Sequence, residues 1–287
     1  MDLKKMVIDF HTHTFPDKIA SKAIANLAAG SHTHHFSDGT LTGLIESKKK
    51  NGIDYVVNLA VATRADQVSH INDGIISHLD AYKEQGIISL GAMHPEFEDY
   101  KAELLKLKNA GIKGIKLHPA FCGTDLSDIR FKNIIAEASS LDMIVLTHAG
   151  LDIGFLDHDY ASIEHILEVM REVKPTKFVL AHMGGWQNWD NVKKYIAGSP
   201  LWLDTAFSLG KVAIIEGEED MMPYKEQLDH EGFVSLVRAH GTDRVLFATD
   251  SPWADQGKYM DFVKESGLNE DELNEVMSGN AVKLLGL

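Results

Sequence analysis

Eight short apolar runs alternate with amphipathic stretches along the whole chain, and this alternation limits the fold more than any other feature. The runs lie at about residues 6–11, 53–61, 87–93, 112–117, 143–147, 177–181, 201–205 and 244–249. Short, almost continuously apolar runs are typical of parallel strands that are buried on both faces. Between them, the segments 100–110, 129–141 and 162–173 place apolar residues three or four apart, which predicts helices.

Eight strand–helix units in one chain of 287 residues favour an α/β fold of the (β/α)8 TIM-barrel class. An open, doubly wound sheet is the alternative, but no glycine-rich phosphate-binding fingerprint follows the first run. The chain has no linker, no low-complexity tract and no repeat beyond the alternation. We therefore expect a single domain that covers residues 1–287.

Two connections, residues 14–51 and 207–241, are longer than a strand-to-helix loop needs. They would form long rim loops after strands 1 and 7, where loops of this fold shape the access of substrate. We expect helices inside them at 17–29 and near 232–239. Towards the end of the chain we expect a helix that Asn269 caps and a last helix at 280–285.

The composition excludes several classes of function. A formal net charge of −14 opposes polyphosphate ligands, so nucleic-acid binding is disfavoured. The single cysteine, Cys122, allows no disulfide within the chain, which is consistent with a reducing cytoplasm. We interpret Cys122 as a small apolar residue that fills space in the core, in preference to a reactive thiol. Residues 1–5 lead straight into the first run without a signal peptide, and no apolar stretch reaches membrane-spanning length. We expect a cytoplasmic protein that binds no membrane.

Histidines and an aspartate stand where several of the predicted strands end. His11 and His13 are two residues apart on a strand, so their side chains point to the same face. His148, His182 and Asp250 close later runs, and the ends of parallel barrel strands meet at one rim. Imidazole and carboxylate together suit zinc, and also manganese, iron or cobalt. Three histidines and one aspartate without cysteine are typical of a catalytic metal site that keeps an open position.

With these residues the sequence resembles the amidohydrolase superfamily, whose hallmarks are a His-x-His on the first barrel strand, a His on the fifth, a His on the sixth and an Asp on the eighth. Here these correspond to His11 and His13, His148, His182 and Asp250. Several short sequence motifs are similar to those of the amidohydrolase-related (amidohydrolase 2) branch, which includes decarboxylases as well as hydrolases. The stretches concerned are 8–13 (IDFHTH), 114–119 (GIKLHP), 181–185 (AHMGG), 248–253 (ATDSPW) and 279–286 (GNAVKLLG).

The resemblance implies a (β/α)8 barrel with one divalent metal, held with an attacking water by His11, His13, His148 and Asp250. Asp250 would take the proton of that water as a general base and then pass it to the leaving group as an acid. His182 would hydrogen-bond the water or polarise the substrate carbonyl.

Other residues at the predicted rim are candidates for substrate binding. Lys116 and His118 share a strand face, and His118 is either a substrate contact or a structural hydrogen-bonding group. Trp186 and Trp253 could stack on a planar substrate or belong to the core rim, and Arg64 could clamp a carboxylate. Other branches of the superfamily bridge two metals with a carboxylated lysine on the fourth strand. For Lys116 we favour either a contact with a substrate carboxylate or a buried charge paired with an aspartate, because carboxylation requires that desolvation first lower its pKa.

Asp204 and Thr205 end the seventh run. They could orient His182 by a hydrogen bond to its far ring nitrogen, or they could cap a loop.

Two functions are compatible with this set of residues. The first is metal-dependent hydrolysis of a C–N or C–O bond in a small molecule such as an amide or lactone. The second is non-oxidative decarboxylation of an aromatic or unsaturated carboxylic acid on the same site. A metal-dependent nuclease is disfavoured by the acidic charge, and a vestigial binding barrel is disfavoured by the intact metal residues. Decarboxylases of the branch that the sequence resembles tend to self-associate, so a homo-oligomer is expected without a defined interface.

Overall fold

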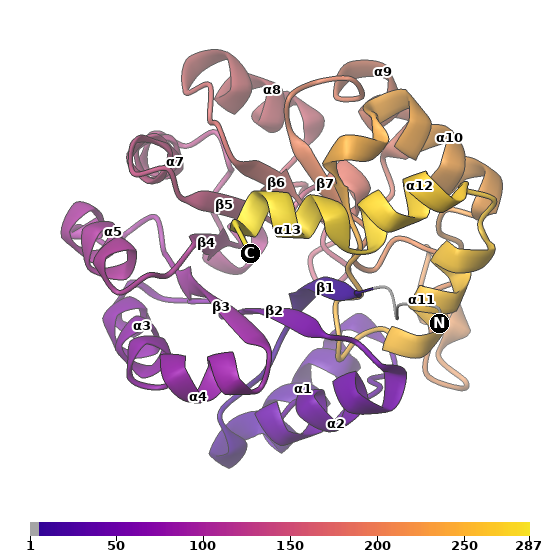
Figure 1. Cartoon of the computed structure of the whole chain (residues 1–287), viewed down its shortest axis with the longest axis horizontal. Coiled ribbons are helices and arrows are strands. Elements are labelled where there is room, and N and C mark those ends of the chain that lie inside the picture. The colour runs from indigo at the N-terminus through magenta and orange to yellow at the C-terminus, as the bar shows by residue number, and fades with distance from the viewer. Residues whose placement is uncertain (1–5) are drawn as a thin grey trace. The chain divides into compact units, whose positions relative to one another are not determined.

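The computed structural model of the chain describes residues 6–287, and these contain eight strands. The strands are β1 (Ile8–Thr12), β2 (Tyr55–Leu59), β3 (Ile87–Ala92), β4 (Gly114–Leu117), β5 (Ile144–Thr147), β6 (Phe178–Leu180), β7 (Trp202–Asp204) and β8 (Val245–Leu246). They form one sheet in the order β1 to β8, with helices in the connections (Figure 1). Each predicted run overlaps one of these strands, and the predicted (β/α)8 barrel class is confirmed.

Thirteen α-helices lie among the described residues. They are α1 (Asp17–Ser31), α2 (Leu41–Asn51), α3 (Val68–Ser77), α4 (Leu79–Glu84), α5 (Tyr100–Asn109), α6 (Pro119–Cys122), α7 (Ile129–Ser140), α8 (Ile163–Glu172), α9 (Trp189–Tyr195), α10 (His230–His240), α11 (Gln256–Glu265), α12 (Glu270–Asn274) and α13 (Asn280–Leu285). The helices predicted at 100–110, 129–141 and 162–173 correspond to α5, α7 and α8. Those predicted at 17–29, 232–239 and 280–285 correspond to α1, α10 and α13, and Asn269 caps α12 as expected.

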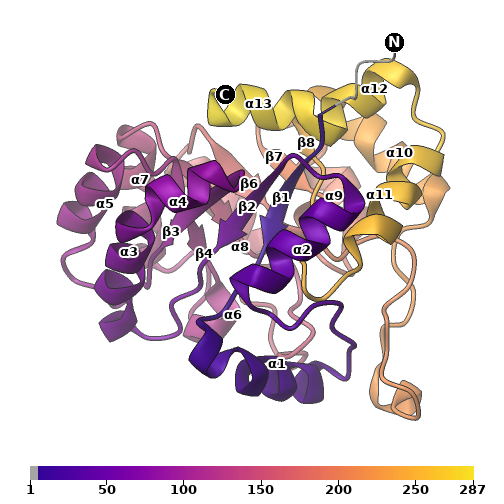
Figure 2. The same cartoon turned by 60° about the horizontal axis from the view of Figure 1, so that its bottom comes forward.

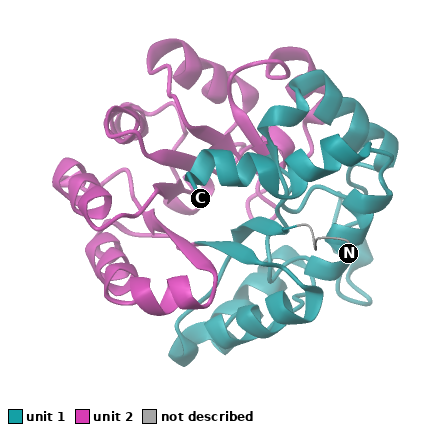
Figure 3. Ribbon diagram, viewed as in Figure 1, with its two compact units in different colours: residues 1–58, 204–287 teal, residues 59–203 magenta. Residues whose placement is uncertain are grey.

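The chain divides into two compact units, which Figure 3 shows in different colours. Unit 1 comprises residues 1–58 and 204–287, and unit 2 comprises residues 59–203. The expectation of a single domain over residues 1–287 stays a prediction. Residues 1–5, on which the expected absence of a signal peptide depends, lie outside the described part of the chain.

In unit 1, β1 pairs in parallel with β2 and is hydrogen-bonded to the β8 segment on its other side. The Phe10 N–H donates to the Phe247 carbonyl at 2.8 Å, and the Asp250 N–H donates to the His11 carbonyl at 2.8 Å. Ile8, Phe10 and Phe247 are completely buried. The core of unit 1 therefore fixes the register between the end of β1 and the end of β8, which is where the predicted ligands lie.

In unit 2, β3, β4, β5, β6 and β7 pair in parallel one after the other. Strand ends that follow one another in such a sheet lie side by side, so residues after β4, β5 and β6 are neighbours. Gly150, just after β5, lies so close to the Trp186 backbone that a Cβ atom would clash with it. This approach keeps the segments that follow β5 and β6 close together.

The two long connections of unit 1 hydrogen-bond to each other. The β1–β2 connection contains α1 and α2, and the β7–β8 connection contains a long irregular stretch before α10 (Figure 2). Thr33 of the first forms an antiparallel bridge with Ile214 of the second, and His32 Nδ1 lies 2.8 Å from Glu218 Oε2. None of the helices formed by residues 6–287 is long and apolar enough to cross a membrane.

Candidate metal centre

Three predicted ligands come together in unit 1. His11 Nε2 lies 3.1 Å from His13 Nε2, and Asp250 Oδ1 lies 3.2 Å from His13 Nε2 and 3.5 Å from His11 Nε2. Zinc binds imidazole and carboxylate at about 2.1 Å, so two ligand atoms at tetrahedral angles are about 3.4 Å apart. The three separations match that value. The donor set and its spacing therefore fit a divalent cation, as the His-x-His on one strand face predicts.

The ends of β1 and β8 hold these side chains by backbone hydrogen bonds. The His13 N–H donates to the Ser251 carbonyl at 2.7 Å, beside the bond between Asp250 and His11 described above. Asp250 has φ of 68°, in the left-handed region that aspartate tolerates better than most residues. Backbone of this kind persists where the surrounding structure holds it and is common at functional sites.

Asp204 orients His11 from the end of β7. Its Oδ2 atom lies 2.8 Å from His11 Nδ1, and both side chains are buried. A carboxylate in this position accepts the Nδ1 proton, which leaves the Nε2 lone pair directed at His13 and Asp250. Asp204 Oδ1 also accepts the Ala206 N–H at 3.1 Å, so the loop-capping role is confirmed. Sequence reasoning did not predict the contact with His11.

Asp9 ties β1 to β8 and α11 behind the ligands. Its carboxylate accepts hydrogen bonds from the Thr249 N–H, the Thr249 hydroxyl, the Gln256 side chain and, at 3.3 Å, the His11 N–H. Burial raises the pKa of Asp9 to about 6, although these hydrogen bonds oppose the rise. Asp9 thus holds in place the residues that adjoin Asp250 and His11.

A second group of donor atoms lies in unit 2. His148, after β5, has Nδ1 3.0 Å from Nε2 of His182, which follows β6. His118, after β4, stacks on His148 with ring centroids 4.7 Å apart. Asp152 Oδ2 lies 3.5 Å from His118 Nε2 and 3.8 Å from His148 Nδ1. All four groups are at most slightly exposed. Asp152 is a loop residue that strand periodicity could not indicate, so sequence reasoning missed it.

The remaining predicted residues differ in their surroundings. Lys116 on β4 and Trp186 after β6 are buried, and Trp253 is partly exposed with its N–H donating to the Asp250 carbonyl. Arg64 lies on the surface, where its side chain binds both carboxylate oxygens of Asp66 at 2.9 and 3.0 Å.

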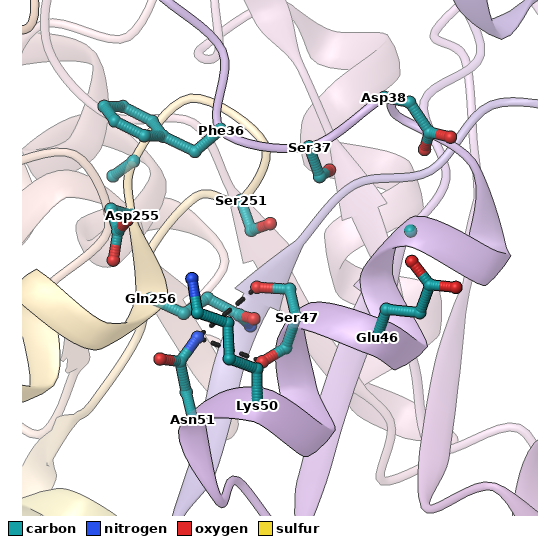
Figure 4. Close-up of a pocket in the computed structure, with 12 residues that line it drawn as sticks. Phe36, Ser37, Asp38, Glu46, Ser47, Lys50, Asn51, Ser251, Asp255 and Gln256 are labelled. Carbon is teal, nitrogen blue, oxygen red and sulfur yellow. Dashed lines mark hydrogen bonds between the residues drawn. The ribbon is translucent and has the colours of Figure 1, made fainter.

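A recess of about 510 Å³ opens in unit 1 beside α2 and the segment after β8 (Figure 4). Its walls include Phe36, Ser47, Lys50, Ser251 and Gln256. Ser251 directly follows Asp250, and Gln256 donates to Asp9, but none of the predicted ligands lines the recess. The recess therefore adjoins the supports of the ligands and not the ligands themselves.

Comparison with known proteins assigns the chain to a family. A family model described as amidohydrolase matches residues 8–287, and the chain belongs to that family. It is a family of enzymes. No curated protein matches the chain.

Solved structures with the same fold have low sequence identity. A 5-carboxyvanillate decarboxylase from Sphingomonas paucimobilis has a TM-score of 0.67 and 14% identity, with 99% of this chain and 100% of that one covered. A dihydroxybenzoic acid decarboxylase from Polaromonas sp. JS666, solved with bound manganese, has a TM-score of 0.69 and 13% identity over 99% and 97%. A protein described as a probable 2-pyrone-4,6-dicarboxylic acid hydrolase from Acinetobacter baumannii has a TM-score of 0.61 and 13% identity, with 98% of this chain and 99% of that one covered. At such identities these likenesses establish the fold alone.

Proposed function

We propose that this amidohydrolase is a metal-dependent hydrolase that acts on an amide, lactone or other C–N or C–O bond of a small molecule. One divalent cation would be held by His11, His13, His148 and Asp250. The observation that carries this proposal is the spacing of the three unit 1 donors, which matches the ligand sphere of such an ion. We further propose zinc, because the donors are mostly imidazole, with manganese, iron or cobalt as the alternatives.

Each residue has a separate task in the proposed reaction. A divalent ion at this position would supply a bound water of lowered pKa and would polarise the bond to be cleaved. Asp250 accepts the proton of the attacking water and passes it to the leaving group. His182 hydrogen-bonds the water or the substrate carbonyl, and its buried position with Nε2 3.0 Å from His148 Nδ1 supports this role. Asp204 keeps His11 in the tautomer that can bind a cation.

The arginines favour hydrolysis over decarboxylation. A decarboxylase must hold a substrate carboxylate, and bidentate arginine is well suited to that task. All five arginines lie in the described part of the chain, and each forms an ion pair with an aspartate or glutamate. The arginines are Arg64, Arg130, Arg171, Arg238 and Arg244. Hydrolysis of a bond in an uncharged group needs no such clamp.

Decarboxylation is the second candidate because Lys116 is buried at the end of β4. A lysine there could pair with a substrate carboxylate in place of an arginine. His118, Trp186 and Trp253 would then contact the rest of a planar substrate. A carboxylated Lys116 that bridges two metals is a further form of the same site, and we rank it below the single ion.

The test is a comparison of two reactions on the purified, metal-loaded protein. Small amides and lactones are assayed for hydrolysis, and aromatic carboxylic acids are assayed for release of carbon dioxide. We expect hydrolysis, and we expect Asp250→Asn to lower kcat by about a hundredfold or more. The exposed Asp261→Asn serves as the matched control in the same unit. Carbon dioxide release without hydrolysis would favour the second candidate, and full activity of Asp250→Asn would remove its role in proton transfer.

Three general proposals accompany the reaction. The substrate is a small molecule and not a nucleic acid, since the net charge is −14. The protein works in the cytoplasm without a membrane contact, since its one cysteine permits no internal disulfide. We also propose that it forms a homo-oligomer, which light scattering of the purified protein can test.

A further inference from the structure

Three metal-binding side chains meet in unit 2 outside the group formed by His118, His148, Asp152 and His182. They are Asp125 between α6 and α7, His158 in the β5–α8 loop and His165 on α8. Asp125 Oδ1 lies 2.7 Å from His158 Nε2 and 3.6 Å from His165 Nε2. The ligand atoms of the three residues all lie within 4.8 Å of one another, which is close enough for one cation to reach all three after a small shift of His158. We propose that these three residues form a second, surface site for a divalent cation of the zinc class.

The neighbours of the two histidines direct their Nε2 atoms at Asp125. Ser127 Oγ lies 2.8 Å from His165 Nδ1. When Nδ1 donates its proton to that hydroxyl, His165 Nε2 carries a lone pair that faces the lone pairs of Asp125 Oδ1. A cation between His165 Nε2 and Asp125 Oδ1 would bind both lone pairs and make their approach favourable. A hydrogen bond from His158 to Asp125 does not have this effect on His165. The His158 ring packs edge-on against Tyr160 at 4.4 Å, which limits its rotation.

The local charge also favours a cation. Asp159 is partly buried, and its carboxylate accepts the Ala161 N–H at 3.1 Å. Asp159 directly follows His158 in the chain, so a further carboxylate is attached to the same loop segment as one of the three donors.

The site would clamp a closed loop. The Gly150 N–H donates to the Ala161 carbonyl at 3.0 Å, so the loop over 150–161 is joined at its base. The Leu126 N–H donates to the Tyr160 carbonyl at 2.8 Å, which attaches that base to the segment of Asp125. His158 lies inside the loop, whereas Asp125 and His165 lie outside it. An ion would therefore link the loop to its two neighbours, and the same loop carries Asp152, which faces His118 and His148.

Zinc binding to the metal-stripped, full-length protein tests the proposal. Wild type is compared with His158→Ala and Asp125→Asn, and with His70→Ala as the control, since His70 is exposed on α3 and belongs to none of the donor groups. We expect wild type and His70→Ala to bind one more equivalent of zinc than either site variant, by calorimetry and by elemental analysis after dialysis. Ser127→Ala should weaken this equivalent by about tenfold. Equal stoichiometry and affinity in all variants would overturn the proposal.

Hydrogen exchange gives a second, independent measurement. Zinc should slow amide exchange in the peptide 150–161 of wild type more than in His158→Ala, which keeps only the first site. Equal slowing in both proteins would assign the effect to the first ion alone and would count against this site. Failure of the proposed hydrolase centre and failure of this second site are distinguishable. If the hydrolase centre binds no zinc, His158→Ala loses the zinc equivalent that it would otherwise keep, whereas the difference between wild type and His158→Ala reports the second site alone.

Discussion

The buried side chain of Asp204 decides which ring nitrogen of His11 is available to a cation. Because Asp204 accepts the Nδ1 proton of His11, replacing it by the near-isosteric asparagine removes the negative charge that fixes the ring. We expect Asp204→Asn to lower metal affinity about 10- to 100-fold, as measured by competition with a chelator. Asp261→Asn is the control and should bind metal like wild type. Unchanged affinity in Asp204→Asn would show that His11 is oriented by packing alone.

Cys122 illustrates how burial controls a reactive group. Burial raises the pKa of its thiol from 9.0 to about 12, so the thiolate fraction near neutral pH falls roughly a thousandfold. We expect the native protein to react with iodoacetamide far more slowly than the unfolded chain, as followed by mass spectrometry at pH 8. Equal rates would mean that the thiol is accessible and ionised in the fold.

At the residue scale, sequence reasoning found the residues that strand periodicity reports. His11 and His13 lie on one face because alternate residues of a strand do so, and their Nε2 atoms are 3.1 Å apart. The contact of Asp204 with His11 depends on how two strands align, and Asp152 depends on a loop conformation. Neither is encoded in local spacing. The joint contact of one ion with His11, His13, His148 and Asp250 stays a prediction.

At the scale of a single element, α12 is stabilised by one carboxylate. Glu272 accepts the Asn269 N–H at 2.7 Å in a capping box and binds Arg238 through both oxygens at 2.9 Å. The hydrogen bonds from Arg238 and then that from Asn269 lower the pKa of Glu272 to about 2. The folded state therefore binds this proton less readily than the unfolded chain does.

A depressed pKa stabilises the fold at a pH above the unfolded value of 4.5, and this contribution is lost as the pH falls towards 2. The pair lies at the surface, so solvent screening limits its contribution to about 1 kcal/mol. We expect Glu272→Gln to lower the free energy of unfolding by that amount at pH 7 and by much less at pH 3, as measured by urea denaturation. The exposed Glu265→Gln is the control, and an equal loss at both values would exclude the titration of Glu272.

Element prediction succeeded where the apolar spacing is strong. The helices α5, α7 and α8 bury three or four residues each at helical spacing, and all three were predicted. In α2 only Leu44 is buried, so the sequence has no apolar stripe there and this helix was missed. A capping hydrogen bond stabilises the N-terminus of α2, because Thr40 Oγ1 accepts the Gly43 N–H at 3.0 Å.

At the scale of the whole molecule, a bound ion would stabilise the fold that holds its ligands. A ligand that binds only the folded state stabilises it by about 2.7 kcal/mol when its free concentration is 100 times the Kd. In the His158→Ala background, which lacks the second proposed site, we expect zinc to raise the melting temperature and a chelator to reverse this. The control is the same protein with Asp250→Asn, whose shift should be smaller. If a chelator leaves the melting temperatures of both proteins unchanged, the proposed ion at this centre is contradicted.

The pairing of the two long connections has a consequence for descent and engineering. Thr33 and Ile214 bridge these connections, and His32 meets Glu218 beside them. An insertion or deletion in either connection removes the hydrogen-bonding partners of the other, so viable length changes must arise in both. A chimera that takes only one of the two connections from a relative should fold poorly. A chimera that takes both connections should keep the fold and show a changed substrate preference.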